Sequence, residues 1–140
     1  MKYKPCFDYI LEKLRAIDSS ITVRFMYNQK EYDDIFSQIR IRNIIRSGHV
    51  RMVEFDIYIY ATDLTELFEY IENLDNVAYN ENTVYETTEG SIIIYEFASI
   101  LDEDVSEEDI RQIPTKDGIE KMYYLYKYPF YIKFQETRNE

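Results

Sequence analysis

The stretch VEFDIYIYATDLTELFEYIENL, residues 53–74, decides the fold. Its first half alternates between apolar side chains and polar or tyrosine side chains, which is typical of a strand with one buried face. The residues on the apolar face are Val53, Phe55, Ile57 and Ile59. In the second half, apolar residues recur at the spacing of an amphipathic helix, and Asp63 stands where a helix N-cap is expected. The stretch therefore predicts a strand of about residues 50–60 that leads directly into a helix.

Hairpins are predicted on both sides of this stretch. Upstream, residues 39–46 form a strand that turns at Ser47-Gly48 and pairs with the central strand. Downstream, residues 83–87 and 91–100 form a second pair of strands. Both hairpins favour antiparallel pairing.

The N-terminal part predicts one helix, one strand and a loop. Residues 7–17 have helical apolar spacing after Pro5, which favours a helix start. Residues 21–27 alternate as a strand does, and the mostly polar residues 28–38 are interpreted as a loop.

The C-terminal part predicts a short helix and a long strand. The helix covers residues 106–113 and is ended by Pro114. Residues 122–134 alternate as a strand, with an edge or a bend expected at Pro129 because proline has no N–H to donate to a ladder.

These elements predict a single α+β domain over residues 1–140, in the order α-β-β-β-α-β-β. One antiparallel sheet carries two amphipathic helices packed on it. An acidic insertion at about residues 101–113 precedes the last strand.

Composition removes several functional classes. No apolar run approaches the roughly 20 residues that span a bilayer, and no signal-peptide core follows Met1, so we expect a soluble protein of the intracellular type with no membrane partner. One Cys and one His give neither an internal disulfide nor a zinc site. The three glycines are isolated, which excludes a glycine-rich phosphate loop.

Charge is distributed unevenly along the chain. The formal net charge is -11, yet residues 52–110 contain 17 carboxylates and no Lys or Arg. A basic group lies on the first hairpin and is a candidate assembly interface: Arg40, Arg42, Arg46 and Arg51. Salt bridges within the monomer are an equally weighted interpretation of these arginines.

Carboxylates form a second candidate surface, facing a lumen or a partner. Its members are Glu54, Asp56, Asp102, Glu103, Asp104, Glu107, Glu108 and Asp109. A calcium loop starting at Asp102 fails, because Glu107 stands where glycine is needed and Ile113 where the bidentate glutamate is needed. We therefore predict no metal site.

Catalytic and nucleic-acid-binding interpretations are weak. His49 and Cys6 have no recognisable catalytic partner in the sequence, and Cys6 is expected to be buried beneath the first helix, so we predict no catalytic residues and no cofactor. Lysines and aromatic residues alternate over residues 121–133 as in some single-strand binders, but the negative net charge opposes stable binding of phosphates.

Four segments together resemble the tail terminator proteins of long-tailed bacteriophages. They are the amphipathic residues 7–14, the short strand 22–25, the join at 53–63 between a long strand and a capped helix, and the tyrosine-rich residues 122–128 after Asp117-Gly118. The loop of residues 28–38 and the acidic insertion depart from the family pattern.

The resemblance implies a non-enzymatic virion protein, assembled in the cytoplasm of the bacterial host. Its copies would form a ring, commonly hexameric, that caps the tail tube and joins it to the head-completion complex. The expected partners are other copies of the chain, the tail tube protein and a head-completion protein. An acidic surface on the ring would repel DNA phosphates.

Two other functions fit the same charge pattern or composition. The main alternative is an acidic inhibitor or anti-defence protein that mimics DNA toward a basic partner. A small enzyme with an unfamiliar site is the third.

Overall fold

Two helices and eight strands form the described part of the computed structural model, which comprises residues 3–25, 34–79, 82–88, 90–100, 109–115 and 118–137. The elements in chain order are α1 Lys4–Ile17, β1 Thr22–Phe25, β2 Ile35–Ser47, β3 Val50–Ala61, α2 Leu64–Asp75, β4 Ala78–Tyr79, β5 Thr83–Thr87, β6 Gly90–Ser99, β7 Arg111–Thr115 and β8 Gly118–Glu136. The predicted α+β class, with two helices and a mostly antiparallel sheet, is confirmed.

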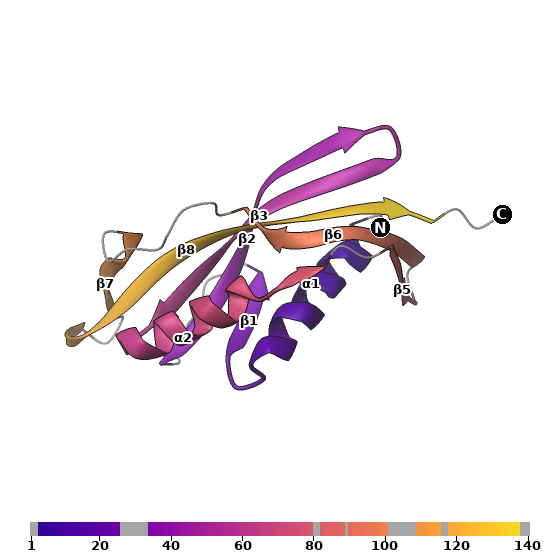
Figure 1. Ribbon diagram of the computed structural model, residues 1–140. Helices are drawn as coiled ribbons and strands as arrows, with labels where there is room; N and C mark the ends of the chain where they lie inside the picture. Colours follow the sequence, from indigo (N-terminus) through magenta and orange to yellow (C-terminus); the bar gives the residue numbers. More distant parts are fainter. Residues whose placement is uncertain are drawn as a thin grey trace.

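The strands form one curled sheet with the order β1-β2-β3-β8-β6-β4 (Figure 1). β5 also pairs with β6, and β7 also pairs with β8. Every pairing is antiparallel except that of β1 with β2, which is parallel. The predicted sheet was wholly antiparallel, which the β1–β2 pair contradicts. The predicted order α-β-β-β-α-β-β also differs in detail, because β4 to β8 follow α2.

The join between β3 and α2 follows the prediction. β3 ends at Ala61, and the side chain of Asp63 accepts hydrogen bonds from the backbone N–H of Thr65 (2.7 Å) and of Glu66 (3.2 Å). These bonds satisfy N–H groups that have no partner inside the first turn of a helix. Strand and helix are thus connected with almost no loop.

Both helices cover the same face of the sheet, and the core lies between them and that face (Figure 1). α1 packs against β1, β5 and β6, and α2 packs against β3 and β8. The apolar side chains of β3 point into this core and are fully buried: Val53, Phe55, Ile57 and Ile59. At its centre Phe55, Phe97 and Phe130 pack with ring centroids 5.7–6.2 Å apart. The opposite face carries no helix among the described residues.

The predicted loop of residues 28–38 is wrong at its end, since β2 begins at Ile35. Residues 26–33 lie outside the described part of the chain. Ser37 and Gln38 look like loop residues, yet both are buried because β1 and β3 flank this part of β2. The hydroxyl of Ser37 lies 3.4 Å from that of Tyr70 on α2.

The predicted helix of residues 106–113 is wrong at its C-terminal end, although Asp109 has a 3₁₀ conformation. Residues 101–108 lie outside the described part, but Arg111–Thr115 form β7, paired with β8. Pro114 lies inside this strand, next to a register irregularity, which is where sheets tolerate proline. The two-residue strand β4 has no alternation long enough to have been predicted.

β8 is one continuous strand, longer than predicted, and its two edges differ. β3 pairs along one edge, whereas the other edge pairs with β6 near the C-terminal end and with β7 near the start. Pro129 lies between these two pairings, and its carbonyl accepts a hydrogen bond from the N–H of Ile100 (3.0 Å). Proline is accommodated there because no ladder partner for its missing N–H is needed.

No helix in the described part of the chain is long and apolar enough to cross a membrane.

Candidate assembly surfaces

The β2–β3 hairpin carries all four arginines of the candidate interface, but two of them are engaged inside the monomer. Gly48 has a φ of 61°, a conformation that favours glycine and closes the turn. Arg51 Nη1 donates hydrogen bonds to the carbonyls of Gly48 (2.7 Å) and Val50 (3.2 Å). Arg51 therefore holds the hairpin turn together.

Arg42 is placed by a β-bulge. Ile41 pairs with Phe55 and Asn43 with Glu54, so Arg42 is the extra residue on β2. Its guanidinium lies 3.5 Å from the Glu54 carboxylate and 3.8 Å from that of Asp56. Because Arg42 is about half exposed, these ion pairs contribute little to stability, but they show the intramolecular pairing expected as one interpretation.

Glu54 and Asp56 lie on the helix-free face, as the alternation predicts, but they do not form a free acidic surface. Glu54 also accepts a hydrogen bond from the Asn43 side chain (3.3 Å). Asp56 is only 5% exposed, and Arg40 is its direct neighbour across the strands. Both carboxylates thus lie beside arginines.

Arg40 and Arg46 are both exposed, yet they lie on opposite faces of the hairpin. Arg40 pairs in register with Asp56 on the helix-free face. Arg46 pairs in register with Arg51, which alternates with the core residue Val53 and so belongs to the helix-covered face. Within the described residues, no ion pair joins Arg46 to a carboxylate. The four arginines therefore do not form one patch.

Most of the predicted acidic surface lies outside the described residues, namely Asp102, Glu103, Asp104, Glu107 and Glu108. Asp109, just before β7, is exposed.

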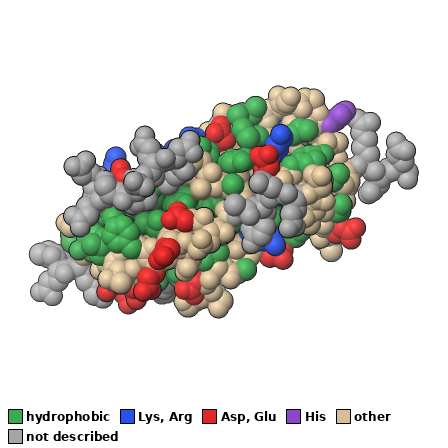
Figure 2. All heavy atoms as spheres, in the orientation of Figure 1, with side chains coloured by type: hydrophobic (Ala, Val, Ile, Leu, Met, Phe, Trp, Pro, Cys, Tyr) green, Lys and Arg blue, Asp and Glu red, His purple; other side chains and the backbone are tan. Residues whose placement is uncertain are grey.

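A row of carboxylates on α2 was missed as a candidate surface. Five acidic residues at the N-cap and along the helix are exposed: Asp63, Glu66, Glu69, Glu72 and Asp75. The last four follow one another at three-residue spacing, so each lies beside the next on the helix surface. The amphipathic spacing of this helix turns its glutamates toward solvent. The helix also contains no Lys or Arg, and this absence sets its acidic face apart. In Figure 2, acidic side chains gather at the lower left, where Figure 1 draws α2.

The acidic helix and the hairpin turn lie at opposite ends of β3. β3 has 12 residues and runs from the turn to the start of α2. At about 3.3 Å per residue, its ends are roughly 36 Å apart. Figure 1 shows the hairpin turn at the upper right and α2 at the lower left. Arg46 therefore cannot pair with the α2 carboxylates of its own chain.

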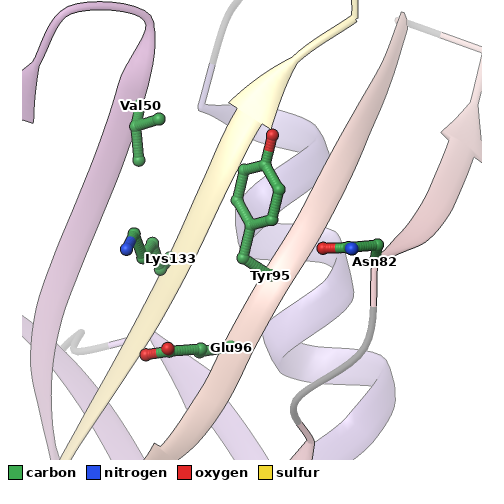
Figure 3. A pocket seen from close by; sticks show the side chains of 5 residues that line it. All are labelled: Val50, Asn82, Tyr95, Glu96 and Lys133. Atoms are coloured by element: carbon green, nitrogen blue, oxygen red, sulfur yellow. The ribbon is translucent and has the colours of Figure 1, made fainter.

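An aromatic cluster and a hollow lie on the helix-free face in the described part of the chain. Phe36 stacks on Tyr60 with centroids 4.6 Å apart, and Tyr123 meets Phe36 edge-on at 5.5 Å. The hollow, of about 370 Å³, lies over β3, β8 and β6, with α1 behind the sheet (Figure 3). It is lined by Val50, Asn82, Tyr95, Glu96 and Lys133. Glu96 and Lys133 are directly paired across the strands, so charge is balanced in the hollow.

Cys6 and His49 do not come together. Cys6 lies on the inner face of α1 and is fully buried, as predicted. Burial raises the pKa of its thiol, which keeps it protonated. His49 is exposed at the hairpin turn. No cluster of three or more potential metal ligands occurs in the described ranges.

The chain matches no protein-family model and no curated protein.

Proposed function

We propose that the protein is a non-enzymatic structural protein of a bacteriophage, similar to tail terminators. Its copies form a ring that caps the tail tube and joins it to the head-completion complex in the virion. The tail tube protein and a head-completion protein are its partners, besides other copies of the chain.

The observation that carries this proposal is the separation of charge along β3. A basic, exposed Arg46 lies near one end, and the carboxylate row of α2 begins at the other, roughly 36 Å away. Opposite charges that cannot meet within one chain are complementary between two chains. The separation therefore favours association of the protein with itself.

The geometry of such a contact favours a ring. When the hairpin of one copy meets α2 of the next, two different surfaces join, which is a heterologous contact. Heterologous contacts close into a ring when the rotation between copies allows it. Carboxylates outside the contact would repel the phosphates of DNA passing through the ring.

Charge reversal tests the contact. We expect the wild type to form a closed oligomer by native mass spectrometry at low ionic strength, and Arg46→Glu to shift it to monomer. Adding Glu69→Arg to Arg46→Glu should restore assembly, because the two charges are exchanged. Lys127→Glu, an equal charge change at an exposed site on β8, is the matched control and should leave assembly intact.

A wild type that stays monomeric at all concentrations, also in the presence of tail tubes, contradicts the proposal. Phage particles that are assembled without the protein, yet have tails of normal length and join heads normally, also contradict the proposal.

The acidic row on α2 also favours the alternative function, a DNA mimic that inhibits a basic partner. Like a phosphate backbone, the row is a line of negative charges, and the helix contains no Lys or Arg that would interrupt it. This function predicts a monomer that competes with duplex DNA for a basic DNA-binding protein, with an affinity that falls steeply as salt increases. Competition that is lost in a Glu66→Gln, Glu69→Gln, Glu72→Gln variant, together with an unchanged monomer mass, would favour the mimic over the ring.

A further inference from the structure

Among the described residues, the outer edge of β2 has a partner strand only at its start. β1 pairs only with residues 36–39 of β2, although β2 continues to Ser47. In the described part of the chain, no strand pairs with the outer edge of residues 40–47. Along that edge, backbone N–H and C=O groups of alternate residues point away from β3. Such a row of unpaired groups can accept a further strand.

Only part of this edge is protected against pairing. In natural proteins, prolines, bulges and charged side chains prevent edge strands from pairing with other strands. The bulge at Arg42 is one such feature, but beyond it the pairing with β3 is regular from Asn43 to Ser47. No proline occurs in this segment, and Ile45 is 41% exposed. The segment Asn43–Ser47 therefore remains a regular and partly apolar edge.

Charge selects what can bind there. Arg40 and Arg42 precede the segment, and Arg46 lies within it. A second copy pairing through the same edge would bring these arginines against their own equivalents, which is unfavourable. Arg42 is already paired with Glu54 and Asp56, but an extended segment rich in carboxylates would find the exposed Arg40 at one end of the edge and Arg46 near the other.

We propose that the segment Asn43–Ser47 of β2, with Arg40 and Arg42 beside it, binds an extended acidic segment of a partner protein as an added strand. Backbone hydrogen bonds hold the added strand, Ile45 packs against its apolar side chains, and the arginines select its carboxylates. The proposal does not depend on ring formation, because the added strand is held by backbone groups of the edge and is tested at Arg40, although Arg46 of the proposed ring contact also lies within the segment.

A model peptide tests this site. The probe is a blocked peptide of about eight residues in which Glu and Val alternate, the length of a typical strand. Added to the full chain, it should slow hydrogen exchange of the outward-facing amides in residues 43–47. The exposed edge strand β5 provides an internal comparison, because its Val84 is 53% exposed but its charged neighbour is Glu86. Its amides should not be protected by an acidic peptide.

Two surface variants separate the site from general charge attraction. Ile45→Glu places a negative charge on the edge and should weaken binding of the acidic peptide about tenfold, whereas Val84→Glu, the matched change on β5, should leave the affinity within about twofold. Arg40→Glu should weaken binding about tenfold at low salt. A peptide methylated on alternate backbone nitrogens should protect no amide of β2.

The proposal is overturned if the peptide binds without protecting residues 43–47, if β5 is protected equally, or if the methylated peptide binds as tightly as the parent. Failure of ring formation with the expected protection of β2 would contradict the proposed function alone. Ring formation without protection would contradict the added-strand site alone.

Discussion

The two faces of β3 differ in what they require from the sequence. Phe55 and Ile57 on the covered face are fully buried between the helices and the sheet, and only apolar side chains can occupy such positions. Tyr58 and Tyr60 on the helix-free face are half-buried, and the charged residues there lie beside arginines. Most of the buried core lies on the covered face, whereas the exposed residues of the helix-free face and of the hairpin are accessible for binding.

The largest expected difference between the faces is in stability. Phe55→Ala should lower the free energy of unfolding by about 3–5 kcal/mol, because it opens a cavity between Phe97 and Phe130. Tyr58→Ala on the other face should cost about 1 kcal/mol. Urea unfolding followed by circular dichroism measures both. Equal losses would break the distinction between the faces.

The covered face should also make stability depend on alkaline pH. Burial raises the pKa of Tyr70 from 10.0 to about 12, the hydrogen bond with Ser37 opposes this rise, and the Asp18 charge adds to it. Since the folded pKa is above the unfolded value, the protonated phenol contributes full stability below pH 10, which is lost as pH rises toward 12. The loss amounts to about 3 kcal/mol.

Tyr70→Phe checks this dependence. Urea midpoints measured from pH 9 upward should fall less steeply in this variant than in the wild type, because the phenol that ionises on unfolding is absent. An unchanged slope would show that Tyr70 is not the group responsible.

The N-cap between β3 and α2 has a smaller effect on stability. Asp63→Ala removes the cap of α2 and should cost about 1 kcal/mol in unfolding free energy. Glu69→Ala, in the exposed part of the same helix, is the control and should change stability by less than about 0.5 kcal/mol. A neutral Asp63→Ala would mean that the strand alone fixes the helix start.

The smallest effect is expected at the hairpin. Arg42→Ala should cost about 0.5–1 kcal/mol, since its ion pairs with Glu54 and Asp56 are about half exposed on the arginine side. Arg40→Ala should be close to neutral, and urea unfolding measures both variants. A loss of about 3 kcal/mol or more for Arg42→Ala would show that the buried Asp56 depends on it for folding.

Local pattern was enough to predict the elements that carry the core. The alternation of residues 53–60, the cap at Asp63 and the turn at Gly48 each act within a few residues, so sequence reasoning finds them. β1 was predicted, but its parallel pairing with β2 was not, because the residues that it pairs with, at the start of β2, were mostly interpreted as a loop. β7 was missed although it pairs with the adjacent start of β8, because the acidic residues before it and Pro114 favoured a short helix.

The candidate surfaces were predicted less well, for a related reason. The four arginines are visible in the sequence, but the bulge directs Arg42 to two carboxylates and the turn engages Arg51. Neither geometry follows from residue spacing. Glu66, Glu69 and Glu72 of α2 face solvent, as the amphipathic spacing predicts, and the absence of Lys and Arg within the helix, more than the number of carboxylates, is what makes them a candidate surface.

The position of β8 has a consequence for the order of folding. β8 lies in the middle of the sheet, between β3 and β6, yet it is synthesised after every other described strand. Until it emerges from the ribosome, β3 and β6 have no common neighbour, and their facing edges are unpaired. The sheet therefore closes late through contacts between distant residues, which slows folding and exposes the nascent chain to aggregation.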